Sequence, residues 1–170
     1  AVTRVLMRDS EKCDSGRDPF ISVIMPVRNE QACLGGLLRQ LLEQDYDPDR
    51  FEILVVDGAS TDGTREVVGE VAALHPQVSL LHNPRVWSSA ARNVGVLASK
   101  GELLVIVDGH CELPGTQYFR TLADAFDRSG ADCLGRPQPL DVADASPLQT
   151  AIAVARDSRL GHHPASFIYS

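Results

Sequence analysis

The chain has 170 residues, 44% hydrophobic and 23% charged, which suits one globular domain with a single core. A net charge of −7 and a sequence pI near 5.1 exclude a nucleic-acid-binding surface, because phosphate backbones are bound by clustered Lys and Arg. No apolar stretch is long enough to span a bilayer, and there is no signal-peptide pattern.

The four cysteines are scattered without a C-x-x-C pair, which favours reduced thiols over a disulfide framework. We therefore expect a cytoplasmic location. The last residues carry no sign of a natural end, so a longer parent chain could hold this part at the cytoplasmic face of a membrane.

Residues 1–18 mix charge, Gly and Ser with little periodicity, and we interpret them as a lead-in or an edge segment. From residue 19 onward, short β-rich runs alternate with polar turns and helical periodicity, which is typical of β-α-β units around a mainly parallel sheet. The expected strands are 20–25, 51–56, 78–82, 103–107 and a weaker 131–134. The expected helices are 30–43, 63–74, 88–100, 115–129 and 147–160, with Asp62 as the N-cap of the second.

Ligands of open α/β sheets collect beyond the carboxyl ends of the strands, so function is expected in the loops that follow them. The loop Pro26-Val-Arg-Asn-Glu30 leaves two interpretations open: a ligand-facing segment, or an ordinary turn in which Asn29 caps the next helix. The loop after the second strand has Gly58 and Gly63 at P-loop spacing, but it lacks the phosphate-binding lysine. A nucleoside triphosphatase is therefore disfavoured.

Two other nucleotide or phosphate folds also fit poorly. A receiver domain would need an acidic pair at the end of the first strand, where Pro26 and Val27 stand. A dinucleotide-binding fold would need a G-x-G-x-x-G motif after that strand, and there is none.

Asp108-Gly-His110 follows the fourth strand, and its two polar residues, at i and i+2, can face the same side. This geometry suits a divalent metal, which as a Lewis acid would stabilise the negative charge on a departing diphosphate. Magnesium prefers oxygen ligands, whereas an imidazole shifts the preference towards manganese. The structural alternative is a turn in which Asp108 caps backbone amides and His110 is merely exposed.

Together, these loops resemble the family 2 glycosyltransferases, a group of inverting enzymes with the GT-A fold, an α/β three-layer sandwich with a mainly parallel central sheet. The resemblance covers about residues 19–115, in the family's order and at suitable separations. The matching segments are 21–30 (ISVIMPVRNE), 52–64 (EILVVDGASTDGT), 90–95 (AARNVG) and 101–110 (GELLVIVDGH).

The resemblance implies a role for most of these loops. In the nucleotide-facing loop, Pro26, Val27, Arg28 and Glu30 would line the base and ribose. Asp57 matches an acid that helps to hold the base; many relatives have a second acid next, where this chain has Gly58.

The third matching segment implies that Arg92 and Asn93 flank the nucleotide, with Arg92 offsetting phosphate charge. The alternative for Arg92 is a surface ion pair that contributes little. Asp108-Gly-His110 occupies the family's Asp-x-Asp position, with His110 in place of the second acid.

This departure resembles the succinoglycan-type branch of bacterial exopolysaccharide glucosyltransferases, in which Asp-Gly-His followed soon by proline is familiar. In that branch His110 would be the metal ligand, and Asp108 would contact the ribose or, through water, the metal. The resemblance thus implies Mn2+ or Mg2+ as the cofactor.

The family's general base, a carboxylate in a later acceptor-side segment, has no match in the chain. Asp141, Asp144 and Asp157 read better as solvated or capping residues, and His162-His163 as an exposed turn. We therefore divide the chain into a lead-in (1–18), a nucleotide-sugar-binding core (19–135) and the start of an incomplete acceptor-side region (136–170).

The function expected from this resemblance is inverting, metal-dependent transfer of a sugar from a nucleoside-diphosphate donor, with UDP-sugar favoured, to a saccharide or lipid-linked acceptor. The alternative is a noncatalytic nucleotide-sugar-binding module, because the general-base segment is missing. A nucleotidyltransferase is disfavoured, since no Gly-rich, basic triphosphate loop follows the first strand.

Overall fold

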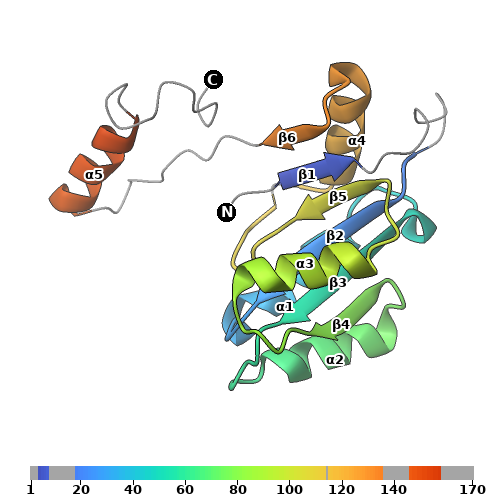
Figure 1. Ribbon diagram of the computed structural model, residues 1–170, viewed down its shortest axis with the longest axis horizontal. Coiled ribbons are helices and arrows are strands. Elements are labelled where there is room, and N and C mark those ends of the chain that lie inside the picture. The colour runs from blue at the N-terminus through green and yellow to red at the C-terminus, as the bar shows by residue number, and fades with distance from the viewer. Residues whose placement is uncertain (1–3, 8–17, 114, 136–145, 158–170) are drawn as a thin grey trace. The chain divides into compact units, whose positions relative to one another are not determined.

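The computed structural model describes residues 4–7, 18–113, 115–135 and 146–157 (Figure 1). Strands and helices alternate over most of this length. The strands are β1 (Arg4–Met7), β2 (Ile21–Val27), β3 (Phe51–Asp57), β4 (Val78–His82), β5 (Leu103–Ile106) and β6 (Cys133–Gly135). The helices are α1 (Gln31–Leu42), α2 (Thr64–Leu74), α3 (Ser88–Ala98), α4 (Tyr118–Ser129) and α5 (Pro147–Asp157), with a short 3-10 turn at Pro48–Arg50.

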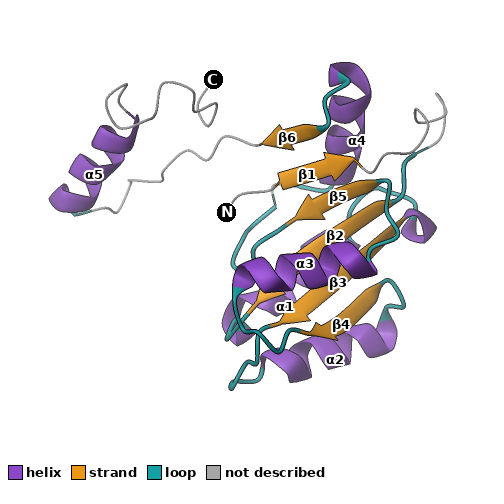
Figure 2. Ribbon diagram, viewed as in Figure 1, coloured by secondary structure: helices purple, strands orange, loops and turns teal. Residues whose placement is uncertain are grey.

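The strands form one sheet in the order β4-β3-β2-β5-β1-β6 (Figure 2). β2 lies parallel to β3 and to β5, and β3 lies parallel to β4, whereas β1 pairs with β5 in the antiparallel sense. Every residue of β2 is buried, as expected for the middle strand of a sheet covered on both faces. The expectation of a mainly parallel sheet is confirmed.

Two hydrophobic clusters lie on opposite faces of this sheet. Val23 and Met25 of β2 pack in one cluster with leucines of α1, Val68 of α2 and Phe119 of α4. Ile24 of β2 packs in the other cluster with Ala91 of α3. Alternate residues of a strand point to opposite faces, so helices cover both sides of the sheet, as Figure 1 shows for α3 on one face. The expected three-layer arrangement is confirmed.

Gly95 determines how closely α3 approaches the sheet. A Cβ atom at this position would lie 2.3 Å from Cγ2 of Ile24, so a side chain there would push the helix away from β2. Arg92 lies one helical turn before Gly95 on the same helix. The close packing therefore fixes the height of Arg92 above the carboxyl edge of the sheet.

The element bounds differ from expectation mainly at helix ends. α1 begins at Gln31, α4 at Tyr118, and α3 ends at Ala98. The segment Arg4–Met7, expected to be a lead-in or an edge, is instead a strand between β5 and β6, with Val5 opposite Val105. Four residues are too few to show a period, and their strand conformation comes from pairing with a segment far away in sequence.

Contacts along the chain divide it into residues 1–134 and 135–170. In the second unit, Ser146 precedes α5, and its amide donates to Oε1 of Gln149 at 2.8 Å. Asp141, Asp144, His162 and His163 lie outside the described residues, as does the side chain of Asp157.

No helix in the described part of the chain has the length and apolar character needed to cross a membrane. Among the described residues, Cys33, Cys111 and Cys133 form no disulfide. Cys13 lies outside them.

Candidate functional site

A pocket of about 430 Å3 lies at the carboxyl ends of β2 and β5, beside the start of α3. It is the place where an open α/β sheet is expected to hold a ligand. Seven of the sequence-predicted site residues line it: Pro26, Val27, Arg28, Glu30, Arg92, Asp108 and His110.

Two predicted residues do not line the pocket. Asn93 is exposed on α3. Asp57 is buried at the end of β3, where its carboxylate accepts from the amide of Ser60 at 3.2 Å and lies 3.7 Å from Nε of Arg65. The roles of Asp57 and Asn93 in nucleotide binding stay predictions.

Four of the titratable residues that line the pocket form two pairs. Nη2 of Arg92 donates to Oδ1 of Asp108 at 3.3 Å. Nδ1 of His110 lies 3.2 Å from Oε1 of Glu30, and the His110 side chain is 61% exposed. With Arg28, which also lines the pocket, the site carries two guanidinium groups, an imidazole and two carboxylates.

Asp108 and His110 fit a metal that is shared with a ligand. No group of three or more His, Cys, Asp or Glu side chains able to hold a metal occurs among residues 4–7, 18–113, 115–135 and 146–157. A cation at this place would take two protein ligands and complete its coordination with phosphate oxygens and water, a common arrangement for magnesium in nucleotide sites.

The contact with Glu30 bears on which nitrogen of His110 would bind a metal. A carboxylate beside Nδ1 favours the tautomer in which Nδ1 carries the proton and donates it to Glu30. The lone pair then lies on Nε2. Histidine ligands of metals are commonly oriented in this way by a carboxylate on the other ring nitrogen.

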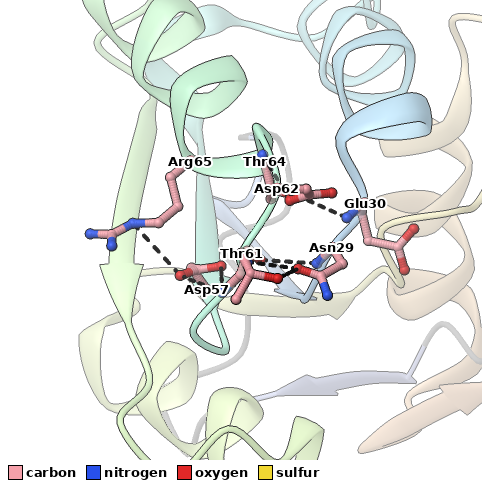
Figure 3. Close-up of polar contacts among 8 residues, drawn as sticks. Asn29, Glu30, Asp57, Thr61, Asp62, Thr64 and Arg65 are labelled. Carbon is pink, nitrogen blue, oxygen red and sulfur yellow. Dashed lines mark hydrogen bonds and ion pairs between the residues drawn. The ribbon is translucent and has the colours of Figure 1, made fainter.

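The loop after β2 is held in place by the loop after β3 (Figure 3). Oδ1 of Asn29 accepts from the amide of Thr61 at 2.8 Å, and the amide of Glu30 donates to Oγ1 of Thr64 at 2.9 Å. Asn29 has a positive φ of 57°, which an asparagine tolerates better than most residues. It therefore ties two loops together and does not cap α1, so that interpretation is wrong. In Figure 3 the Glu30 carboxylate points away from the Thr61–Thr64 segment.

Asp62 caps two helices from one position. Oδ1 accepts from the amide of Thr64 at 3.0 Å, at the start of α2, and Oδ2 accepts from the amide of Gln31 at 3.3 Å, at the start of α1. The Thr64 hydroxyl also donates to this carboxylate, which lowers the pKa of Asp62 below its ordinary value. The expectation that Asp62 is the N-cap residue of α2 is wrong by one position: Gly63 is the N-cap, and the Asp62 side chain accepts from the first helical amide.

Sequence reasoning missed the part of the pocket that comes from the segment before α3 and from its first turn. The residues it missed are Val86, Trp87, Ser88, Ala91 and Gly109. Only the tryptophan before a serine pair at the start of a helix could have drawn attention to the segment. The loop conformation, with Val86 at a φ of 68°, has no sequence signature.

The sequence model of the glycosyl transferase family 2 matches residues 22–157, which include β2 except its first residue, β3 to β5 and the whole pocket. The chain belongs to this family. The resemblance that the four sequence segments indicated is thereby confirmed.

Relatives of this family 2 chain come from archaea and bacteria. Glycosyltransferase AglE of Haloferax volcanii is 34% identical over 118 residues, which are 69% of this chain and 38% of AglE. The succinoglycan biosynthesis protein ExoA of Rhizobium meliloti is 32% identical over 142 residues, which are 82% of this chain and 42% of ExoA. The expected resemblance to the succinoglycan-type branch is therefore confirmed, and the chain spans well under half the length of these relatives.

Solved structures of GT-A glycosyltransferases share the fold of this chain. The mannosyltransferase PcManGT of Pyrobaculum calidifontis, in complex with GDP-Man and Mn2+, is 35% identical with a TM-score of 0.59, covering 66% of this chain and 32% of that one. TarS of S. aureus (residues 1-349) in complex with UDP is 27% identical with a TM-score of 0.57, covering 65% and 32%. The family 2 chain thus has the expected GT-A fold.

Proposed function

We propose that this family 2 chain is the donor-binding part of an inverting, metal-dependent glycosyltransferase. Its donor would be a nucleoside-diphosphate sugar, with UDP-sugar favoured, and its acceptor a saccharide or a lipid-linked saccharide. The observation that carries the proposal is the grouping of Arg92, Asp108 and His110 in one pocket at the carboxyl edge of the sheet.

Each of the three residues has a chemical task in this proposal. Asp108 and His110 would hold a Mn2+ or Mg2+ ion, which when bound supplies Lewis-acid stabilisation to a leaving diphosphate. Arg92 offers a charged donor to the phosphate oxygens, and such charge-assisted hydrogen bonds are about twice as strong as neutral ones. An acidic chain with a net charge of −7 needs this local positive charge to bind an anionic donor.

Glu30 takes a different role from the one that the family resemblance implied. It was expected to line the base and ribose, but its carboxylate contacts the imidazole of His110. We assign it the positioning of His110, so that Nε2 faces the metal. Pro26, Val27 and Arg28 then form the wall that faces the nucleoside.

The relatives support this assignment by what their names state. PcManGT was solved with GDP-Man and Mn2+, and TarS with UDP. ExoA is named for succinoglycan biosynthesis, so we propose that this chain serves bacterial exopolysaccharide assembly. We place it in the cytoplasm or at the cytoplasmic face of a membrane.

A noncatalytic nucleotide-sugar-binding module is the second candidate. Among the pocket-lining residues that the structure describes, the carboxylates are Glu30 and Asp108, and each is engaged with a basic side chain. Neither is free to act as the general base that an inverting transfer needs. A longer parent chain that transfers sugar would favour the enzyme over the binding module. Variants of that longer chain without the acceptor-side carboxylate should then transfer no sugar.

Calorimetric titration with UDP, GDP and dTDP, each with and without Mn2+, tests the proposal. We expect metal-dependent binding of at least one nucleotide, and its loss in His110→Ala. His82→Ala is the matched control, because His82 is an exposed histidine that does not line the pocket. Binding that ignores the metal, or an unaffected His110→Ala variant, would reject His110 as a ligand.

A further inference from the structure

Trp87 is a large aromatic side chain that stands open to solvent at the edge of the pocket. It is 76% exposed and lines the pocket. The other large hydrophobic side chains that the structure describes as exposed, such as Leu74 and Leu97, do not line it. An exposed aromatic ring beside a polar pocket needs an explanation, because burial would stabilise it by removing a large apolar area from water.

The backbone that carries Trp87 is held firmly. Asn83 is fully buried, and its Nδ2 donates to the carbonyl of Trp87 at 3.0 Å while its Oδ1 accepts from the amide of Arg85 at 3.1 Å. The amide of Asn83 donates to the carbonyl of Asp57 at 2.8 Å, which ties the loop to the end of β3. The hydrogen bonds of Asn83 therefore fix the backbone of the loop that holds Trp87 at the surface.

Val86 lies in this loop at a φ of 68°, a conformation that is a genuine outlier for a β-branched residue. Backbone strain of this kind persists only where the surroundings enforce it, and it clusters at ligand sites. Glycine at position 58 leaves room for this conformation, because a Cβ atom there would lie 2.7 Å from the carbonyl oxygen of Val86. The loop thus packs directly against the end of β3.

The two ends of the pocket differ in chemistry. Asp108 and His110 follow β5, whereas the loop that presents Trp87 packs on the end of β3, and β2 lies between these strands. A nucleoside diphosphate whose phosphates lie near Asp108 would extend its nucleoside along the sheet edge towards β3. That end of the pocket offers the indole ring and the wall formed by Pro26 and Val27.

We propose that the indole of Trp87 stacks on the planar base of the bound nucleotide. The inference rests on the proposed function and adds a binding residue that contacts the π-face of the base. Stacking tolerates different bases, because every base has a π-face. Trp87 therefore contributes affinity for the nucleoside, and the selection among bases falls to other groups.

Trp87 is the only tryptophan of the chain, so its emission reports directly on the stacking. Iodide quenching should be strong in the free protein, because the ring is open to solvent. With Mg2+ present, UDP should lower the quenching and change the emission. Inorganic pyrophosphate with Mg2+ should leave both unchanged, because it fills the phosphate end and has no base.

Calorimetry on variants gives an independent readout. Trp87→Ala should weaken UDP about 10-fold, the scale of base stacking on an aromatic ring, and should leave pyrophosphate affinity unchanged. Trp87→Phe keeps a ring and should retain most of the UDP affinity. Leu97→Ala, an equally exposed apolar position of α3 outside the pocket, is the matched control and should bind like the unaltered protein.

The outcomes separate this inference from the proposed function. The stacking would be overturned if UDP bound the unaltered protein without changing its iodide quenching and also bound Trp87→Ala with full affinity. The proposed function would then still stand. Equal protection of Trp87 by pyrophosphate, or equal loss of pyrophosphate binding in Trp87→Ala, would also overturn it. Absence of any calorimetric binding of UDP, GDP and dTDP would overturn both.

Discussion

Arg92 and Asp108 neutralise each other in the pocket, with Nη2 of the guanidinium 3.3 Å from Oδ1 of the carboxylate. Both side chains keep contact with solvent, being 37% and 22% exposed, and ion pairs of this kind contribute little to stability. In a diphosphate bound to a metal ion, the negative phosphates complement the charge of Arg92 and the cation complements the charge of Asp108. In the proposed function, this pair would be exchanged for a diphosphate on Arg92 and a cation on Asp108.

Replacing Arg92 by Gln should separate phosphate binding from metal binding. We expect UDP affinity in the presence of Mn2+ to fall about 10-fold, because a charged hydrogen bond to phosphate is lost. Mn2+ alone should bind at least as tightly as before, since the cation that competes for Asp108 is gone. Calorimetry and the electron paramagnetic resonance signal of free Mn2+ measure the two affinities.

Arg85→Gln is the control for this prediction, because Arg85 is an exposed arginine of the neighbouring loop that does not line the pocket. Weaker binding of Mn2+ alone in Arg92→Gln would contradict the exchange of partners.

Removing the Glu30 carboxylate should weaken the metal site without removing a ligand. Outer partners of metal-binding histidines are typically worth about 10- to 100-fold in metal affinity, and we expect Glu30→Ala to lose Mn2+ affinity within this range. Glu30→Gln keeps an acceptor for Nδ1 of His110 and should lose less. Titrations that follow the electron paramagnetic resonance signal of free Mn2+ in the presence of UDP measure the loss of affinity. Glu43→Gln, at the far end of α1, should change nothing, and equal losses in Glu30→Ala and Glu43→Gln would count against the positioning role.

Gly58 should not accept a side chain. Its hypothetical Cβ would lie 2.7 Å from the Val86 carbonyl oxygen, a backbone atom of the strained loop. We expect Gly58→Ala to lower the free energy of unfolding by about 1–3 kcal/mol, as is typical of overpacking. Urea unfolding measures the difference.

The matched control is Gly69→Ala in α2, where a Cβ would meet nothing within 4 Å. Alanine in an open helical position should stabilise by about 0.5–1 kcal/mol. Similar effects of the two substitutions would show that the Val86 carbonyl does not restrict Gly58.

The hydrogen bonds that the Asp62 carboxylate accepts at the starts of α1 and α2 should make the free energy of unfolding depend on pH. Hydrogen bonding by Thr64 lowers the pKa of Asp62 in the folded chain, so its carboxylate stabilises the fold fully above the ordinary pKa of about 4. That contribution is lost as the pH falls through the lowered folded pKa. Urea unfolding of the protein and of Asp62→Asn across this range should give a stability difference that is constant at neutral pH and shrinks in acid.

Thr64→Ser keeps the hydroxyl that donates to Asp62 and should preserve the acid dependence, whereas Thr64→Val should reduce it. A stability difference between the protein and Asp62→Asn that stays the same at every pH would mean that the Asp62 charge has no part in capping.

The sequence was sufficient for the order of the helices and of the strands from β2 onward, and for seven of the twelve residues that line the pocket. Pro26, Asp108 and His110 follow strands whose apolar runs are easily recognised, and the parallel arrangement brings such residues to one edge. Arg92 could be predicted as a site residue because it lies in segment 90–95, which resembles the family. These positions follow from local pattern and a general rule of topology.

Other features depend on contacts that no local pattern encodes. β1 is a strand because Val5 pairs with Val105. The pairing of Glu30 with His110 joins residues 80 positions apart, and the positioning role that we propose for Glu30 rests on it. Trp87 enters the pocket through a loop that Asn83 fixes from within and that places a valine at positive φ, against its intrinsic preference.

The central claim is that a divalent cation bridges Asp108 and His110 to a diphosphate. Anomalous X-ray diffraction from crystals grown with UDP and Mn2+ tests it most directly. We predict one manganese peak beside Nε2 of His110 and the Asp108 carboxylate, with Arg92 turned to the phosphates. Bound UDP without a manganese peak at these two residues, or a peak elsewhere in the pocket, would contradict the claim.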